Sequence, residues 1–145
     1  MTRPWMLVAG DFMPSGGMDR ANFALAARLA RTGHEVHLVT HRAAETLRRC
    51  GAIVHAVSRP ARSHALGMPL LARAARRRAT QLAGRRALVV ANGGNCVLPG
   101  VNWVHYVHAV YDPVRDASGV SRALASLQRG YVLGREQCAL AAASV

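Results

Sequence analysis

The stretch from Trp5 to His41 decides the fold of this chain: WMLVAGDFMPSGGMDRANFALAARLARTGHEVHLVTH. It opens with a short apolar run, Met6 to Ala9, which is typical of a central parallel strand covered on both faces. A Pro-Ser-Gly-Gly loop follows, and then a helical pattern that ends at Gly33, where a left-handed backbone costs glycine little. Val36 to Thr40 form a second apolar strand. The stretch therefore predicts a βαβ unit.

The rest of the chain continues this alternation. We expect further strands at Ile53–Val57, Ala87–Ala91 and Asn102–Ala109, and helices at Ala43–Cys50, Pro69–Ala83 and from Ser118 to about Ala143, the last interrupted or bent near Gly130 and Gly134. Ser15 or Asp19 is expected to cap the first helix. Strands alternating with helices imply a parallel sheet with right-handed crossovers. The predicted fold class is α/β, a Rossmann-like doubly wound parallel sheet.

Length, composition and charge limit the classes of protein to which this chain can belong. A chain of 145 residues is the size of one domain, and it has neither an apolar run long enough to span a bilayer nor a signal-peptide pattern, so we expect a cytoplasmic location. The three cysteines are far apart and form no metal-binding or disulfide pattern. The net charge of +12 comes from arginine, without any lysine, and favours anionic partners such as nucleotide phosphates or an anionic membrane surface.

The loop Ser15-Gly16-Gly17 is the first candidate site. Adjacent glycines leave backbone N–H groups unshielded, and the following helix directs the positive end of its dipole towards the same place. Both features suit a phosphate. The loop nevertheless matches neither G-x-G-x-x-G nor a P-loop, so a turn that merely needs glycine stays an equal alternative. An NAD-type enzyme is disfavoured because His41-Arg42, and no acidic residue, follow the second strand, although an arginine there would tolerate NADP.

Polar residues at the predicted strand ends form the second candidate site. His108 lies at the carboxyl end of its strand, where parallel sheets bind ligands, and Tyr111 and Asp112 follow it. His105 points to the opposite strand face, so the two histidines do not share a metal ion, and we predict no metal site. Three more residues at strand ends are expected to line the same crevice: Asp11, Asn92 and Asn95.

The helix predicted at Pro69–Ala83 carries a broad basic face that includes Arg73, Arg76 and Arg77. Such a face is usually solvated, but a basic amphipathic helix also suits anionic headgroups. Nucleic acid is disfavoured because the sequence has no helix-turn-helix or RNP-like pattern and few aromatic residues.

The same motifs resemble a known family. The segment from Asp11 to Thr40, with its Pro-x-Gly-Gly loop and its Leu-Ala-x-x-Gly-His-x-Val helix end, looks like the N-terminal signature of GT-B glycosyltransferases of family 4. WVHYVHAVYDP, residues 103–113, is similar to the family's strand-end histidine segment. REQCALAAASV, residues 135–145, resembles the helix and strand that lead to its interdomain crossing.

The resemblance implies a function for the matching positions. Gly16 and Gly17 would approach the donor diphosphate or the acceptor, and His108 would orient the donor sugar or stabilise charge in the transition state. The implied reaction is transfer of a sugar, with retention of configuration, from a nucleotide-diphosphate sugar to a saccharide or lipid-linked acceptor at the cytoplasmic membrane face. No tightly bound cofactor is implied.

Residues 1–145 would then be the N-terminal, acceptor-side half of a GT-B enzyme. The chain ends in a pattern that looks like the start of a sixth strand, and the family's donor-binding second domain, with its Glu-x7-Glu segment, is absent from this sequence. We therefore expect this half to be inactive by itself. Two alternatives stay open: a non-catalytic Rossmann-like module that binds a phosphate-bearing ligand or an anionic membrane surface, and an NADP-type oxidoreductase.

Overall fold

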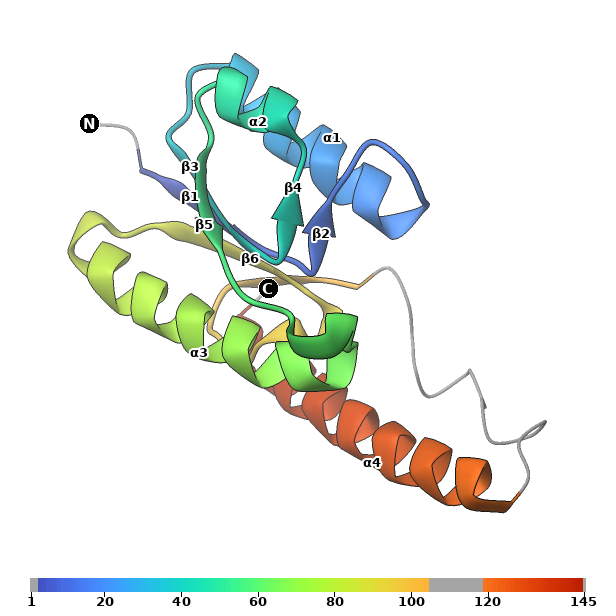
Figure 1. The fold of residues 1–145 in the computed structure, drawn as a ribbon. Coiled ribbons are helices and arrows are strands. Elements are labelled where there is room, and N and C mark those ends of the chain that lie inside the picture. Colours follow the sequence, from blue (N-terminus) through green and yellow to red (C-terminus); the bar gives the residue numbers. More distant parts are fainter. Residues whose placement is uncertain (1–2, 105–118, 145) are drawn as a thin grey trace.

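The computed structural model describes residues 3–104 and 119–144. Its main sheet has five parallel strands: β1 (Trp5–Val8), β3 (Val36–Thr40), β5 (Ile53–Ala56), β6 (Leu88–Asn92) and β7 (Val101–Trp103). Their order is β5-β3-β1-β6-β7. Strands β3 and β5 are added on one side of β1. The chain then returns, and β6 and β7 are added on the other side of β1 (Figure 1). The predicted Rossmann-like α/β fold is confirmed.

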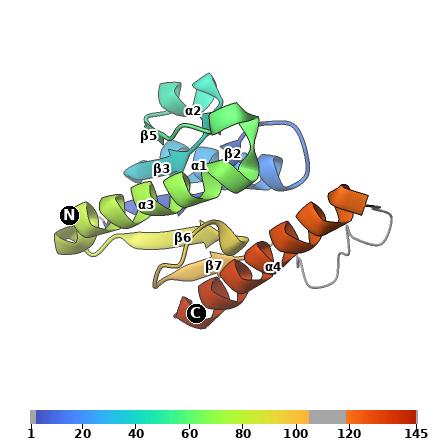
Figure 2. The same ribbon diagram turned by 60° about the horizontal axis from the view of Figure 1, so that its bottom comes forward.

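Helices cover both faces of this sheet. In Figure 1, α1 (Met18–Arg31) and α2 (Glu45–Arg49) lie on one face, and α3 (His64–Leu82) lies on the other. Figure 2 shows α4 (Gly119–Ala142) on the same side as α3. Successive side chains of β1 point to opposite faces, so Leu7 packs with the α1 core while Met6 and Val8 pack with the α3 core. One strand therefore anchors both cores.

The first βαβ unit matches the sequence prediction closely. The end of α1 is closed by Gly33, whose φ is +80°, with Gly33 N donating to Ala30 O and His34 N donating to Leu29 O, both at 3.1 Å. This is the Schellman arrangement that satisfies the last carbonyl groups of a helix. The predicted cap at the other end was wrong: Gly17 is the N-cap residue, and no side chain caps the helix.

The predicted start of α3 at Pro69 was also wrong. The helix begins at His64 because Ser63 acts as its cap, with Ser63 Oγ accepting a hydrogen bond from Leu66 N at 3.4 Å. Pro69 is tolerated inside the helix. The extra turn brings Gly67 against the rim of the sheet, where an added Cβ would lie 2.8 Å from His41 Nε2 and 3.1 Å from Arg59 Cγ.

The last helix is continuous, so the predicted interruption near Gly130 and Gly134 was wrong. Neither glycine has a positive φ, and glycine within a helix costs only about 1 kcal/mol relative to alanine. The sequence also did not predict a second, two-stranded parallel sheet, β2 (Asp11–Phe12) with β4 (Arg42–Ala43). Three short 3₁₀ turns complete the described elements: η1 (Pro60–Arg62), η2 (Ala83–Arg85) and η3 (Gly93–Asn95).

Only the first part of the predicted strand Asn102–Ala109 can be compared, and there the structure has β7. His105, His108, Tyr111 and Asp112 lie outside the described residues. The segment after α4 returns to the edge of the sheet, where Ser144 N donates to Gly100 O at 3.0 Å, but residues 143–144 form no strand. No helix among the described residues is long and apolar enough to cross a membrane.

Candidate functional site at the switch point of the sheet

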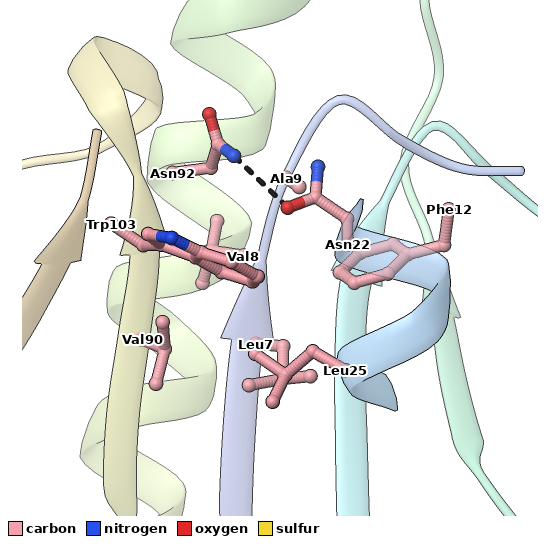
Figure 3. A pocket seen from close by; sticks show the side chains of 9 residues that line it. All are labelled: Leu7, Val8, Ala9, Phe12, Asn22, Leu25, Val90, Asn92 and Trp103. Carbon is pink, nitrogen blue, oxygen red and sulfur yellow. Dashed lines mark hydrogen bonds between the residues drawn. The ribbon is translucent and has the colours of Figure 1, made fainter. Parts of the chain in front are cut away.

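The strand order reverses between β1 and β6, which makes this the topological switch point of the sheet. Open α/β sheets bind ligands outside the carboxyl ends of the strands at such a point. A pocket lies there, between the ends of β1 and β6, the start of α1, and β7 (Figure 3). Its empty volume is about 190 Å³, open solvent included. It is lined by Leu7, Val8, Ala9, Phe12, Asn22, Leu25, Val90, Asn92 and Trp103.

Two buried amides form the polar part of this pocket. Asn92 Nδ2 donates to Asn22 Oδ1 at 2.9 Å, and both residues are at most 5% exposed. In Figure 3 the remaining amide oxygen of Asn92 and the amide nitrogen of Asn22 point away from the apolar floor made by Leu7, Leu25 and Val90. An acceptor and a donor are thus presented side by side, which is the pattern that hydroxyl groups recognise.

Asn95, predicted to line the crevice beside Asn92, has a structural role. Its Nδ2 donates to the carbonyl oxygen of Asn92 at 2.6 Å and so holds the turn that follows β6. Gly94, in the same turn, makes room for α4, because an added Cβ would lie 3.3 Å from Glu136 N. Of the Asn-Gly-Gly-Asn motif, only Asn92 lines the pocket.

The Ser15-Gly16-Gly17 loop is exposed and lies beside this pocket without lining it. Gly16 has a φ of +82°, a conformation that glycine adopts most easily, whereas Gly17 has a φ of −77° and no atom within 4 Å of an added Cβ. No side chain caps α1, so the first-turn N–H groups are not occupied by a cap. The loop is therefore exposed, and no side-chain cap occupies the backbone donors at the start of α1.

Asp11, which the sequence predicted to line the ligand crevice, is not among the residues that line this pocket. It is 6% exposed and binds two arginines through Oδ2: Arg42 Nη2 at 2.8 Å and Arg59 Nη1 at 3.4 Å. The hydrogen bond and the charge of Asp11 raise the pKa of Arg42. Asp11 thus ties β2, β4 and the segment after β5 into a rim, because buried carboxylates need paired charges. Since Arg42 is engaged in this pair, it does not favour the NADP alternative.

Asp19 lies beside the glycine loop. Its Oδ2 would be 3.9 Å from a Cβ added to Gly16. Burial, and then the negative charge of Asp11, raise the pKa of Asp19 above its ordinary value. The loop therefore combines backbone donors with a carboxyl group that holds its proton more strongly than usual, a combination suited to hydroxyl groups.

The remaining candidates lie away from the pocket. Arg73, Arg76 and Arg77 are exposed on α3, on the opposite face of the sheet from α1. The described residues hold no group of three or more His, Cys, Asp or Glu side chains that could bind a metal ion.

A family model completes this description. The model for Glycosyltransferase Family 4 matches residues 15–142. The chain belongs to glycosyltransferase family 4. No curated protein and no solved structure matches it. Glycosyltransferases bind a sugar donor and an acceptor, and this chain is a domain of that kind.

Three residues at or near the pocket were not predicted from the sequence as site residues: Asn22, Arg59 and Trp103. Asn22 was hidden within the apolar stripe of α1, although an amide among Ala26 and Leu29 is itself a signal for a buried polar contact. Arg59 carried no signal, because its partner Asp11 is far away in sequence. Trp103 was predicted as a strand residue only, and the pocket gives it a place beside the ligand crevice.

Proposed function

We propose that residues 1–145 form the acceptor-side half of a retaining GT-B glycosyltransferase, which transfers a sugar from a nucleotide-diphosphate sugar to a saccharide or lipid-linked acceptor. The observation that carries this proposal is the family 4 match over residues 15–142. The pocket at the switch point of the sheet supports it, because open α/β sheets bind ligands outside the carboxyl ends of their strands at such a point. A second α/β domain supplies most donor contacts, so this half is inactive alone.

Four groups of this chain take part in the proposed reaction. The exposed loop amides at Gly16 and Gly17 and the positive end of α1 bind an acceptor hydroxyl or the departing diphosphate. The Asp19 carboxyl group beside the loop offers a hydrogen-bonding partner to the acceptor hydroxyl. Asn22 and Asn92 offer hydrogen bonds to the reacting sugars, and His108 supports the donor sugar and its developing charge.

The enzyme works on the cytoplasmic face of the membrane in this proposal, where a lipid-linked acceptor is available. The exposed arginines of α3 suit anionic headgroups, each contributing about 1 kcal/mol near the surface. The donor is a substrate, and no tightly bound cofactor is needed.

The deciding experiment uses the full-length enzyme with a panel of nucleotide sugars and measures release of the nucleoside diphosphate. His108→Ala should lower kcat by about a hundredfold or more, because preorganised groups at the reacting centre contribute that much. His105→Ala is the matched control, since the sequence pattern predicts that the two histidines point to opposite faces of a strand. Equal turnover of wild type and His108→Ala would remove His108 from the mechanism. No turnover with any donor, by a folded two-domain protein, would overturn the proposed function.

A further inference from the structure

The amide pair of Asn22 and Asn92 has hydrogen-bonding capacity that the described residues leave unused. Both residues are at most 5% exposed, and the bond from Asn92 Nδ2 to Asn22 Oδ1 is the only side-chain hydrogen bond that either forms within residues 3–104 and 119–144. An asparagine side chain can donate two hydrogen bonds and accept two. A buried polar group without a partner is costly, so a half-used pair at the end of a strand needs an explanation.

A purely structural role does not account for this pair. Replacing both members of a buried hydrogen-bonded pair by apolar groups of the same shape is nearly neutral for stability, so joining α1 to β6 does not require amides. The unused groups also share a direction: in Figure 3 the oxygen of Asn92 and the nitrogen of Asn22 both point towards the carboxyl ends of the strands. Exchanging nitrogen and oxygen in both amides would still leave one donor and one acceptor there.

The surroundings of the pair suit a neutral ligand. The described residues that line the pocket include no charged side chain, so a phosphate or an ammonium group would be buried there without a counter-charge. Trp103 on β7 is the register partner of Asn92 on β6, which places the indole beside the amide on the same face of the sheet. The indole supplies a flat apolar surface, against which the C–H face of a sugar ring can pack.

We propose that this pocket binds a neutral sugar ring of the acceptor through two neighbouring hydroxyl groups, one donating to Asn92 Oδ1 and the other accepting from Asn22 Nδ2. Each hydroxyl group can both donate and accept, so two adjacent ones satisfy both unused amide groups at once. The two asparagines then determine which acceptors are used, because a site built to bind a hydroxyl group rejects an analogue that lacks it. The assignment to the acceptor rests on the proposed function, in which this chain is the acceptor-side half.

Acceptors that lack a single hydroxyl group test this pairing in the full-length enzyme. The probes are the methyl glycosides of glucose, galactose and mannose and their monodeoxy derivatives. Loss of a hydroxyl group at either of two neighbouring ring positions should lower kcat/KM by about tenfold or more. In the double variant Asn22→Leu with Asn92→Leu, which leaves neither amide unpaired, these two losses should have no further effect. The KM for the donor should stay unchanged, and a merely structural pair would not produce such position-specific effects.

Saturation-transfer NMR with the same glycosides measures binding without turnover. At least one glycoside should give a signal with the wild-type enzyme, and the double variant should lose it. Asn95→Ala is the matched control and should keep the signal, because the Asn95 amide holds the turn after β6 and does not line the pocket.

Four results would each overturn this inference: no signal from any glycoside, the same deoxy-sugar profile in wild type and double variant, an equal loss in folded Asn95→Ala, or a signal from uridine alone that the double variant abolishes. The proposed function fails differently. Glycoside binding through the two amides without turnover of any donor would contradict sugar transfer but keep the sugar-binding pocket, whereas turnover that is independent of the amides would do the reverse.

Discussion

Gly16 and Gly17 are adjacent in sequence but differ in backbone conformation. Gly16 needs the left-handed region, whereas the φ of Gly17 is accessible to any residue and the space above it is open. The fold therefore accounts for Gly16. Gly17 has no such structural reason to lack a side chain, and a ligand that approaches the start of α1 supplies one.

Gly16→Ala and Gly17→Ala should consequently differ in effect. Gly16→Ala is expected to lower the free energy of unfolding by about 1 kcal/mol, since a left-handed backbone strains alanine. Gly17→Ala should leave stability within about 0.5 kcal/mol of wild type but raise the KM of the full-length enzyme for its acceptor or donor. Urea denaturation and steady-state kinetics measure the two effects. An unchanged KM in Gly17→Ala would show that the loop binds no substrate there.

A hydrogen-bonded chain of side chains joins β3 and β5 to α3. Arg78 Nη2 donates to His55 Nδ1 at 2.9 Å, so the neutral His55 carries its proton on Nε2 and donates to His37 Nδ1 at 2.9 Å. His37 Nε2 then donates to Glu35 Oε1 at 2.8 Å. The hydrogen bond from Arg85 is the main reason that the pKa of Glu35 falls to about 2. His55 is therefore neutral in the intact network.

This network predicts a loss of stability in mild acid. Burial, with the charge of Arg78, lowers the pKa of His55 from 6.5 to about 4. The unfolded chain binds a proton at His55 below pH 6.5 and the folded chain resists it until about pH 4, so stability is complete above 6.5 and falls between 6.5 and 4. We expect a loss of about 1 kcal/mol, discounted for the partial exposure of this ring.

Urea unfolding at pH 7 and pH 5 measures this loss, and His55→Gln should reduce the difference between the two values. Asp19 acts in the opposite sense, because its raised pKa makes the folded state bind a proton more strongly as the pH falls. Identical pH dependence in wild type and His55→Gln would contradict the role given to His55.

At the scale of elements, α4 is held to the domain mainly where its backbone approaches η3. The approach depends on Gly94, because any Cβ there would lie 3.3 Å from Glu136 N and 3.5 Å from its Cα. The same turn follows Asn92, so the position of α4 and the end of the strand that lines the pocket are coupled.

Gly94→Ala should therefore lower the free energy of unfolding by about 1–2 kcal/mol, since the backbone of α4 must shift to admit the methyl group. Gly84→Ala is the control: nothing lies within 4 Å of its added Cβ and its φ is not positive, so it should be neutral or slightly stabilising. Thermal unfolding of the two variants makes the comparison. Equal stabilities would mean that α4 does not rest on η3.

At the scale of the whole molecule, the two cores share one sheet and should unfold together. Leu47 in the α1–α2 core and Leu71 in the α3 core are both 0% exposed. Leu47→Ala and Leu71→Ala should each cost about 2–5 kcal/mol, whereas Leu66→Ala, at a 55% exposed position of α3, should cost less than about 1 kcal/mol. Each variant should still unfold in one transition.

Coincident far-UV circular dichroism and tryptophan fluorescence curves would establish this cooperativity, because Trp5 and Trp103 lie on different strands of the sheet. Separate transitions in Leu71→Ala would show that the α3 core unfolds on its own and would contradict the shared-sheet explanation.

Local patterns explain which predictions succeeded. Runs such as Met6 to Ala9 are apolar throughout and end at a glycine or a polar residue, so the strands, α1 and the cap at Gly33 could be predicted from neighbouring residues alone. The prediction of where α3 begins was wrong because Pro69 is a strong local signal for a helix start. In the structure, the cap at Ser63 starts the helix earlier. The predicted interruption of α4 was wrong for a similar reason: glycine lowers helix propensity but does not break the hydrogen bonds of the helix.

The sequence by itself determined the alternation of strands and helices, the glycine loop and the family of this protein, because each depends on residues close together along the chain. Only the tertiary structure decided that Asp11 is a paired rim residue, that Asn22 meets Asn92 in the pocket, and that His55 belongs to a relay. These contacts join residues that are distant along the chain. They exist because the order β5-β3-β1-β6-β7 brings separate strand ends together, and no local pattern encodes which ends will meet.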